Sequence, residues 1–465
     1  MDWSIEELAQ AAGGTIVQRG AALRVGEVCT DSRRVERNGV FVALRGEVHD
    51  GHAFVPEAAR RGSGCVIVQG NVALAREVAV IRVRDTLRAL GDVAHYHRRR
   101  LAPRVLAITG SNGKTTTKEM LFSILQRARL DDRPLRGRVL KTEGNYNNLV
   151  GLPLTLLRLR GRERAAVVEL GTNRPGEIRR LTAIAEPDVA VITSVAPAHL
   201  SGLKTVAGVA REKGAIFRGL GAHGTAVVNL DDARVARQSR AFQGRVVTYG
   251  TGGQVRGEDP EMLVGGRLRF NLRVGRVREP VRLRLCGLHN VRNAVGAAAM
   301  AHAFGVDVTA IRKGLEAVRP VSMRMEVERW RGIGIINDAY NANPASMEAA
   351  LAALRAIPSR GRRVAVLGDM LEMGENESAC HREVGETAAR SGLDTLYVMG
   401  RFAREIRRGA VGAGMEPSAV RVARAHQPLG EELRGVLRKG DWVLVKGSRG
   451  AAMEQVLAAM KDGGA

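Results

Sequence analysis

A-I-T-G-S-N-G-K-T-T-T, residues 107–117, is the stretch that decides the fold of this 465-residue chain. We expect an apolar strand before it, over residues 104–108, and a helix after it, over residues 116–127. A glycine-rich turn between a strand and a helix leaves backbone N–H groups free for phosphate oxygens, and the helix dipole adds its positive end. The pattern therefore predicts a nucleotide-phosphate site and not an ordinary glycine turn.

Two side chains of this loop suit the chemistry of a bound polyphosphate. Lys114 offers a mobile positive charge to the terminal phosphates, and the Thr115 hydroxyl suits Mg²⁺. The usual G-x-x-x-x-G-K-[ST] pattern has a glycine where this chain has Ile108. The predicted nucleotide contacts in the loop are Gly110, Ser111, Asn112, Gly113, Lys114, Thr115 and Thr116.

Length and composition favour a soluble protein of several domains. A chain of 465 residues is too long for one ordinary core, so about two to four domains are expected. Hydrophobic residues make up 45% and charged residues 26%, which is typical of globular proteins. No apolar run approaches the roughly 18 residues of a membrane span, and the N-terminus carries acidic residues where a secretory signal has basic ones. We expect a cytoplasmic protein without a membrane span.

The formal net charge of +24 does not by itself predict a nucleic-acid partner. Basic residues are spread along the whole chain, and an aromatic content of 3% leaves few platforms on which bases could stack. A positive field would also attract small anionic substrates. Arginine dominates and lysine is rare, so a lysine inside a motif is informative. The four cysteines form no C-x-x-C pair, which favours buried thiols over zinc ligands or disulfides.

Strand–loop–helix units recur along the chain and predict three α/β domains, over residues 1–102, 103–319 and 320–465. We expect a small N-terminal α/β domain, a central P-loop-type parallel sheet and a Rossmann-like C-terminal domain. Ligands gather outside the carboxyl ends of parallel strands. Glu169 lies at the end of one apolar strand, over 164–170, and His199 follows the next, over 188–195, so both are predicted on the side of the phosphate loop.

Five motifs, of which the first is the phosphate loop, follow one another in a fixed order and carry a family resemblance. T-G-S-N-G-K-T-T, E-L-G, A-H-L with A-R-E-K-G, H-N-V-R-N-A and N-D-A-Y-N-A-N-P span most of the chain. This ordered set resembles the Mur ligase family, the ATP-dependent amide-forming enzymes of peptidoglycan precursor synthesis. T-E-G-N-Y-N-N, D-A-Y-N-A-N-P-A-S-M and L-G-D-M-L-E-M-G are most similar to the member that adds D-alanyl-D-alanine to UDP-N-acetylmuramoyl-tripeptide, and those two compounds are the expected partners of a monomer.

Other assignments remain open at this point. The diamino-acid-adding ligase of the same family is similar, but its Asp-Asn-Pro-Arg motif is not visible here. A folylpolyglutamate synthetase would share the architecture. A P-loop ATPase acting on nucleic acid is favoured only by the charge, and it would need an aspartate at the strand end where this chain has Glu169.

The resemblance implies that the tripeptide carboxylate attacks the γ-phosphoryl of ATP and that the dipeptide amine attacks the resulting acyl phosphate. The catalytic residues that it implies are Lys114, Glu169, His199 and Lys213, and the Mg²⁺ ligands that it implies are Thr115, Glu169, His199 and Lys213. From composition alone Lys213 reads as a surface helix lysine, whereas the resemblance implies an N-carbamate. Arginine could not form that carbamate because it is not deprotonated.

The resemblance also implies contacts with the rest of ATP and with the nucleotide-sugar substrate. The further ATP contacts are Asn293, Arg324 and Asp338, of which Arg324 would otherwise read as a solvated charge. The substrate contacts are Ser32, Arg33, Gly46 and His52 for the UDP part, Asn145, Asn147 and Asn148 for the muramoyl part or the diphosphate, and Asn337, Tyr340 and Asn341 at the interface with the last domain. ATP would then lie between two domains, and domain closure would assemble the site.

Overall fold

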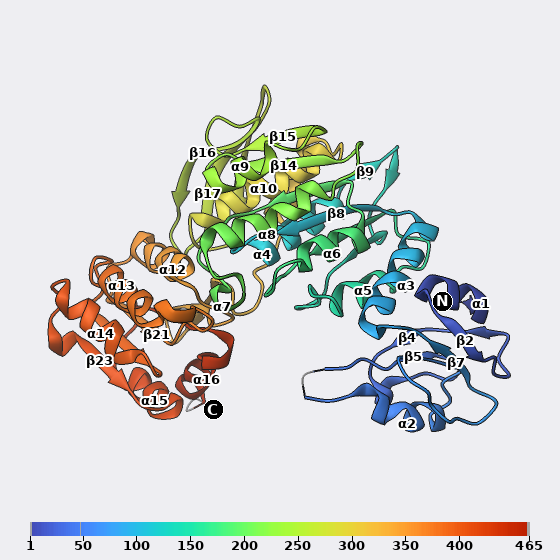
Figure 1. The fold of residues 1–465 in the computed structure, drawn as a ribbon. Coiled ribbons are helices and arrows are strands. Elements are labelled where there is room, and N and C mark those ends of the chain that lie inside the picture. The colour runs from blue at the N-terminus through green and yellow to red at the C-terminus, as the bar shows by residue number, and fades with distance from the viewer. Residues whose placement is uncertain (1, 47, 463–465) are drawn as a thin grey trace.

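The computed structural model describes residues 2–46 and 48–462, which build three main sheets covered by helices. Figure 1 shows the N-terminal and C-terminal lobes on either side beneath the central one. The predicted α/β fold with three domains and mostly parallel sheets is confirmed. Each main sheet falls within one of the predicted domains, although the boundaries at 102/103 and 319/320 stay predictions.

The first sheet has five strands in the order β2-β7-β6-β5-β4, parallel except for β2. The strands of this lobe are β1 (Trp3–Ser4), β2 (Thr15–Gln18), β3 (Arg24–Val25), β4 (Val28–Cys29), β5 (Val40–Val42), β6 (Cys65–Val68) and β7 (Ala79–Arg82). Its helices are α1 (Ile5–Ala12), η1 (Ser32–Arg34), η2 (Gly51–Phe54), α2 (Val55–Arg60) and α3 (Thr86–Leu101). Helix α3 ends at Leu101, and its C-cap Ala102 directly precedes Pro103.

The central sheet has nine strands in the order β11-β12-β8-β13-β14-β15-β16-β17-β18, and it is parallel as far as β16. The strands are β8 (Arg104–Thr109), β9 (Arg129–Leu130), β10 (Arg133–Pro134), β11 (Val139–Lys141), β12 (Ala165–Glu169), β13 (Val189–Ile192), β14 (Thr225–Asn229), β15 (Arg245–Tyr249), β16 (Val255–Met262), β17 (Leu268–Val274) and β18 (Val277–Leu283). The helices are α4 (Lys114–Leu125), α5 (Gly151–Leu156), α6 (Glu177–Ala185), α7 (Leu200–Leu203), α8 (Val206–Arg218), α9 (Ala233–Ser239), α10 (His289–Ala303) and α11 (Val308–Glu316).

The last sheet has six strands in the order β19-β20-β24-β21-β22-β23, parallel except for β19. The strands are β19 (Glu326–Trp330), β20 (Ile333–Asp338), β21 (Arg363–Leu367), β22 (Thr395–Met399), β23 (Val420–Ala423) and β24 (Trp442–Lys446). The helices are α12 (Pro344–Ala356), η3 (Gly374–Asn376), α13 (Glu377–Ala389), α14 (Ala403–Gly412), η4 (Pro417–Ala419), α15 (His426–Val436), η5 (Arg449–Ala451) and α16 (Glu454–Lys461).

Strand β8 shows how the central sheet places the phosphate loop between two cores. Side chains alternate along a strand, so Val105 and Ala107 enter one core, which also contains residues of α6 and α8. Leu106 and Ile108 enter the other core, together with residues of α4 and α10. Burial on both faces fixes β8 in the middle of the sheet, and the loop leaves from its carboxyl end.

Two details differ from the sequence predictions. Helix α4 begins at Lys114, two residues earlier than predicted, because Gly113 in the left-handed region (φ 83°) serves as its N-cap. All four cysteines are free thiols, but only Cys65 and Cys286 are buried, and Cys29 and Cys380 are partly exposed.

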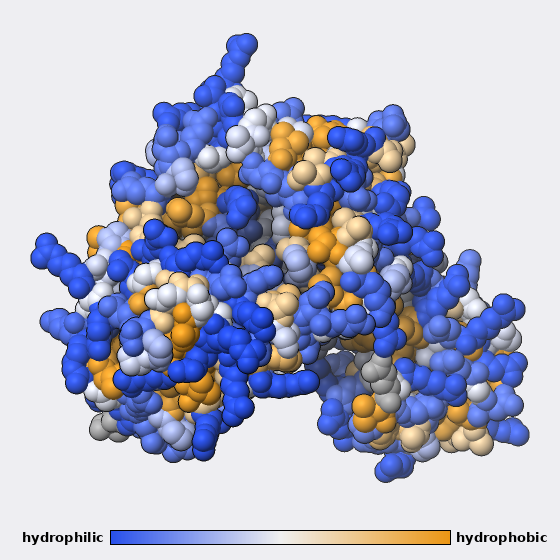
Figure 2. All heavy atoms as spheres, turned by 60° about the vertical axis from the view of Figure 1, so that its left-hand side comes forward, coloured by the Kyte–Doolittle hydropathy of each residue, from blue (hydrophilic) through white to orange (hydrophobic). Residues whose placement is uncertain are grey.

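The visible surface is mostly hydrophilic (Figure 2). Figure 2 shows hydrophilic side chains over most of the visible face, with apolar side chains in smaller patches between them. Among the described residues, no helix has both the length and the apolar character needed to cross a membrane.

Candidate functional site

The phosphate loop is clamped between the end of β13 and the start of α10 at two glycines. Gly110 has φ 151°, and a Cβ there would lie 1.8 Å from Thr193 Oγ1. A Cβ on Gly113 would lie 2.2 Å from Asn293 Oδ1. Both positions therefore exclude every residue except glycine. The usual pattern has a glycine at position 108, where this chain has Ile108, and the Ile108 side chain lies in the core. Gly110 and Gly113, which the close contacts require, are both present.

Lys114 is half-buried at the first turn of α4 and folds back over its own loop. Its Nζ donates to the carbonyl oxygens of Gly110 (2.7 Å) and Ser111 (3.4 Å). Burial lowers the pKa of Lys114, and the charge of Arg324 lowers it further while Glu169 raises it. The lysine head thus lies between a carboxylate of the central domain and an arginine that begins the last domain.

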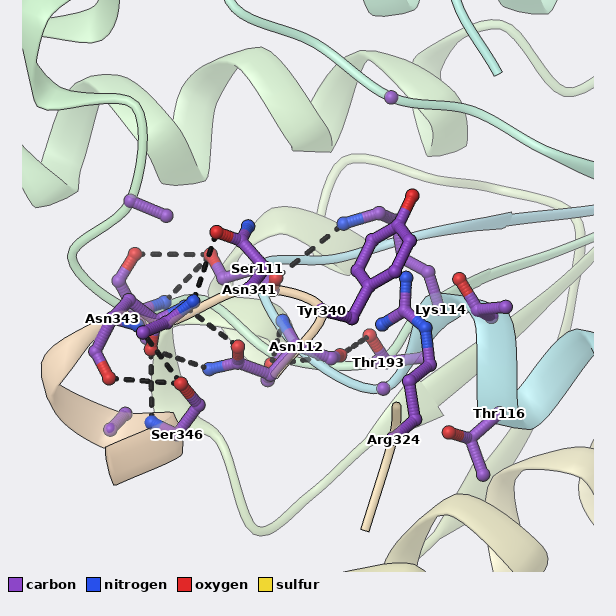
Figure 3. A pocket seen from close by; sticks show the side chains of 18 of the residues that line it. Ser111, Asn112, Lys114, Thr116, Thr193, Arg324, Tyr340, Asn341, Asn343 and Ser346 are labelled. Atoms are coloured by element: carbon purple, nitrogen blue, oxygen red, sulfur yellow. Dashed lines mark hydrogen bonds between the residues drawn. The ribbon is translucent and has the colours of Figure 1, made fainter. Parts of the chain in front are cut away.

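A cavity of about 770 Å³ opens above this loop, with walls from the central and the last domain (Figure 3). Most predicted site residues line it: Ser111, Asn112, Gly113, Lys114, Thr115, Thr116, Asn145, Asn147, Asn148, Glu169, His199, Asn293, Arg324, Asp338, Tyr340 and Asn341. The predicted residues outside this lining are Gly110, Lys213, Asn337, Ser32, Arg33, Gly46 and His52.

Glu169 is held at the end of β12 by three contacts. Thr115 Oγ1 donates to Glu169 Oε2 (3.0 Å), and Asn147 Nδ2 donates to Oε1 (2.9 Å). The Glu169 backbone N–H donates to Thr142 Oγ1 (3.0 Å). The carboxylate is 2% exposed, so its orientation is fixed next to the loop threonine.

Lys213 is the buried cation of helix α8, not the surface lysine that composition alone suggests. Its side chain is fully buried, and its Nζ has no hydrogen-bond partner among the described residues. Burial lowers its pKa well below the usual value, and the charge of Lys114 adds to this effect, whereas Glu212 and Glu169 oppose it. Glu212 does not pair with the amine because it accepts from the backbone N–H groups of Gly176 (2.8 Å) and Ile178 (2.7 Å).

His199 lines the cavity but bonds across the domain interface. Its backbone lies in the left-handed region (φ 54°), as does that of Glu372 (φ 64°) in the last domain. His199 Nδ1 lies 2.8 Å from Glu372 Oε2, and this hydrogen bond lowers the pKa of Glu372. Within 2–46 and 48–462, no group of three or more His, Cys, Asp and Glu side chains could hold a metal ion. Of the predicted ligands, the structure joins Thr115 to Glu169 directly but turns His199 toward Glu372.

In the last domain, Asp338 forms a buried ion pair that the site predictions missed. Lys446 Nζ donates to Asp338 Oδ2 (2.5 Å) and to the carbonyl oxygen of Asn341 (2.9 Å). The Met325 backbone N–H donates to Asp338 Oδ1 (3.0 Å). Lys446 is one of few lysines and lies inside the motif K-G-S-R-G, so the rarity of lysine was a signal that could have found it.

Arg324 and the asparagines of the interface complete the wall of the cavity. The Arg324 guanidinium lies 3.9 Å from the centre of the Tyr340 ring, as Figure 3 shows, an arrangement that favours a cation–π contact. Asn293 donates to Asn290 Oδ1 (2.8 Å). Asn148 Oδ1 accepts from the N–H groups of Val150 and Gly151 at the start of α5, and Asn145 is exposed.

The residues predicted to bind UDP lie in polar loops of the first domain, where their polar atoms have local partners. Ser32 Oγ donates to Glu57 Oε2 (2.8 Å), and Arg33 forms two side-chain bonds with Asp31. His52 Nδ1 lies 2.6 Å from Asp50 Oδ1, and its Nε2 accepts from the Gln69 N–H (2.9 Å). The Gly46 N–H donates to the His49 carbonyl oxygen (2.9 Å). Asn337, at the end of β20, is 8% exposed and accepts from the Ala339 N–H.

Comparisons with known proteins cover all three domains. Sequence models of the Mur ligase family, catalytic domain, of the Mur ligase middle domain and of the Mur ligase, glutamate ligase domain match residues 24–98, 108–301 and 323–449. The UDP-N-acetylmuramoyl-tripeptide–D-alanyl-D-alanine ligase of Bacillus subtilis (strain 168) is 35% identical over 434 residues, 92% of each chain. That of Treponema pallidum (strain Nichols) is 37% identical, over 97% of this chain and 98% of the relative.

Solved structures give the same result. A crystal structure of MurF from Acinetobacter baumannii is 34% identical, with a TM-score of 0.91 over 99% of each chain. The MurF ligase from Thermotoga maritima in complex with ADP is 28% identical, with a TM-score of 0.83 over 94% of this chain and 97% of that one.

Proposed function

The chain belongs to the Mur ligase family, and we infer that it joins D-alanyl-D-alanine to UDP-N-acetylmuramoyl-tripeptide, with ATP, in peptidoglycan synthesis. Relatives that carry this activity in their names match it over nearly its whole length. The observation that carries the inference is the placement of Lys114, Glu169 and Arg324 around one cavity between two domains. That arrangement suits transfer of a phosphoryl group between two anionic reactants.

The reaction that we propose activates a carboxylate before the amide forms. A terminal carboxylate oxygen of the tripeptide attacks the γ-phosphorus of ATP, the bond to the β,γ-bridging oxygen breaks, and ADP leaves. The dipeptide amine then attacks the acyl carbon, inorganic phosphate leaves, and the amine nitrogen loses a proton. Because both reactants of the first step are anions, positioning and charge neutralisation are the main demands on the protein.

The chain's own cations are positioned to meet these demands. Lys114 leaves the carbonyl oxygens of Gly110 and Ser111 when phosphate oxygens compete for its Nζ. Arg324, on the Tyr340 ring, approaches the same phosphates from the last domain. Asp338, fixed by Lys446 and the Met325 N–H, presents a carboxylate that suits ribose hydroxyl groups, and Asn293 lies beside the loop for the adenine. Substrate binding between the two domains excludes water from the acyl phosphate.

Thr115, Glu169, His199 and Lys213 are the residues that we propose to hold Mg²⁺. The fit rests on Lys213, whose buried amine has no hydrogen-bond partner among the described residues and is subject to the charge of Glu169. As a cation it would repel a metal ion, but as an N-carbamate it would offer an anionic oxygen, which Mg²⁺ prefers. Bound there, Mg²⁺ would neutralise charge on the transferring phosphoryl group.

Burial prepares Lys213 for the carbamate that we propose. Its lowered pKa favours the neutral amine, whose lone pair can attack the carbon of CO₂. The N–C bond forms, one N–H proton leaves to solvent, and an anion replaces a buried neutral group. The charge of Lys114 nearby stabilises that anion.

For the nucleotide-sugar substrate, we propose the polar loops of the first domain as the UDP site and Asn145, Asn147 and Asn148 as contacts of the muramoyl part or the diphosphate. Ser32, Arg33, Gly46 and His52 are the candidates in those loops, and Asn337, Tyr340 and Asn341 shape the last-domain side. We further propose a monomer that works in the cytoplasm, where ATP is available and four free thiols remain reduced.

Phosphate release tests the proposed function. The chain is supplied with ATP, UDP-N-acetylmuramoyl-tripeptide and D-alanyl-D-alanine, and in a parallel reaction with ATP, the UDP-dipeptide precursor and diaminopimelate or lysine. We expect phosphate and a new amide only from the first set. Turnover only with the second set would instead assign the diamino-acid-adding activity.

A further inference from the structure

The phosphate loop and the last domain touch through two asparagine side chains that are 231 positions apart. Asn343 Nδ2 donates to Asn112 Oδ1 (2.8 Å), and Asn112 Nδ2 donates to Asn343 Oδ1 (3.3 Å). Figure 3 shows the two carboxamides facing each other at one end of the cavity. We propose that this pair is an amide latch that holds the last domain in register with the phosphate loop, so that Asn112 and Asn343 are positioning residues for ligation.

On the central side, the latch has an anchor that does not depend on nucleotide. The Asn112 backbone N–H donates to Ser194 Oγ (3.2 Å), and its carbonyl oxygen accepts from Thr193 Oγ1 (2.6 Å). Thr193 and Ser194 directly follow β13, in the middle of the central sheet. The backbone of Asn112 is therefore fixed to the sheet, and its side chain is free to reach across the interface.

On the other side, Asn343 is part of the same loop as the proposed ATP contacts of the last domain. It caps helix α12, because its Oδ1 accepts from the Ser346 N–H (3.0 Å) and its own N–H donates to Ser346 Oγ (2.9 Å). The chain from Asp338 at the end of β20 to Asn343 is only six residues long, and Lys446 bonds both Asp338 and Asn341. Fixing Asn343 therefore fixes where Asp338 and Tyr340 face the cavity.

The chemistry of the pair goes beyond helix capping. Aspartate, serine or threonine would cap α12 about as well as asparagine. An ionised carboxylate only accepts, and a hydroxyl donates and accepts through one oxygen, whereas a carboxamide carries its donor and its acceptor on two separate atoms and can form both bonds of the pair. Asn343 is 7% exposed, and a hydrogen bond shielded from water is stronger. A second polar contact between the two domains, between His199 and Glu372, has side chains that are 23% and 55% exposed, so it contributes less.

The variant Asn343→Asp distinguishes the role of Asn343 in the latch from its role as the N-cap of α12. The new carboxylate keeps the capping bond, still accepts from Asn112 Nδ2 and suits the positive end of the helix, but it loses the bond that Asn343 Nδ2 donates to Asn112 Oδ1. We expect kcat for ligation to fall about fivefold, in keeping with the loss of one hydrogen bond, with an unchanged KM for the UDP substrate. Small-angle scattering without ligands should show a larger radius of gyration than wild type, because the last domain swings away more often. The matched control is Asp307→Asn at the cap of α11, which should change neither value.

A double-mutant cycle with Asn112→Ala gives the second readout. If the two side chains act only through each other, the double variant should lose no more activity than the more affected single variant. The latch would be overturned if the fold-losses in kcat of the two single variants multiplied in the double variant. It would also be overturned if Asn343→Asp had the kcat and the radius of gyration of the wild type. The proposal rests on ATP binding at the loop. A wild-type chain that ligates neither substrate pair refutes the proposed function instead, and the scattering comparison then still decides about the latch.

Discussion

The cavity and the polar loops of the first domain were both predicted to bind substrate, yet they satisfy their polar atoms in opposite ways. In the first domain, Ser32 and His52 bond to neighbours in the same small lobe. Outside the lining of the cavity, Lys213 has no partner among the described residues, and Asn112, which lines the cavity, finds its partner in another domain. The first arrangement stabilises a loop without a ligand, whereas the unpartnered amine of Lys213 carries an energetic cost that a ligand or a modification can remove.

The difference teaches where a functional assignment has physical support. An unpartnered buried amine costs free energy, so its presence beside a phosphate loop calls for a chemical reason. A satisfied surface ion pair such as Arg33 with Asp31 calls for none. The burial of Lys213 without a partner among the described residues therefore supports a special role for this lysine, whereas the assignments in the first domain rest on the family resemblance, and the roles of both sets of residues stay predictions.

The largest expected effect comes from Lys213→Met, which removes the amine but fills a similar volume. We expect a loss of ligation rate of about 100-fold or more, the scale seen when one electrostatic group of an active site is removed. In buffer free of bicarbonate, unfolding should cost about 1–3 kcal/mol more than for the wild type, because a buried group without a partner has been removed. Phosphate release and thermal unfolding measure the two quantities.

Bicarbonate provides the control for that experiment. Added bicarbonate should raise the activity and the melting temperature of the wild type and leave Lys213→Met unchanged. Lys313→Met, a change of an exposed lysine on α11, should respond to bicarbonate as the wild type does. If Lys213→Met kept the ligation rate of the wild type, the unpartnered amine would have no functional role, and this contrast with the first-domain loops would be lost.

A smaller effect is expected at the buried pair of Asp338 and Lys446. Asp338→Asn leaves the Lys446 ammonium, which is 2% exposed, without its counter-charge. We expect a loss of about 3 kcal/mol in the free energy of unfolding, measured by urea denaturation with tryptophan fluorescence. The double variant with Lys446→Met should recover part of that loss. Glu386→Gln, at an exposed pair with Arg390, should cost less than about 1 kcal/mol, and an equal cost at both pairs would contradict the distinction.

The sequence was sufficient for the parts of the site that depend on local pattern. Gly110, Lys114 and Glu169 follow strands whose apolar character is plain, so their place at the carboxyl ends of a parallel sheet could be predicted. The partnership of Asn112 with Asn343 could not, because no local pattern reports a contact between side chains 231 positions apart. Such contacts depend on how domains are oriented, which periodicity and turn signals do not encode.

The burial of Lys213 could not be predicted from the sequence for a related reason. Its helix α8 is amphipathic, but the residues that enclose it come from other elements of the central domain. Composition therefore favoured a surface lysine, and only the resemblance pointed elsewhere. Lys446 is the opposite case. Lysine is rare in this chain and Lys446 lies inside a motif, so its role could have been predicted from the sequence.

The smallest expected effect is at Arg33, and this variant tests whether the first-domain loops bind substrate as the cavity is proposed to do. If Arg33 binds the substrate as proposed, Arg33→Ala should raise the KM for UDP-N-acetylmuramoyl-tripeptide about tenfold with little change in kcat, because one charge-assisted hydrogen bond made equally in ground and transition states is lost. Arg60→Ala, an exposed arginine of α2, is the matched control.

The same variant reports on Asp31 whatever happens to KM. The hydrogen bond from Arg33 holds the pKa of Asp31 at about 2, below the usual value near 3.9. The stability that this carboxylate contributes is thus present above about pH 3.9 and is lost as the pH falls toward 2. In Arg33→Ala, NMR titration should find the Asp31 pKa closer to its usual value, so the stability that this carboxylate contributes becomes smaller and less of it is lost as the pH falls. An unchanged KM with a shifted Asp31 titration would mean that Arg33 serves its loop and not the substrate.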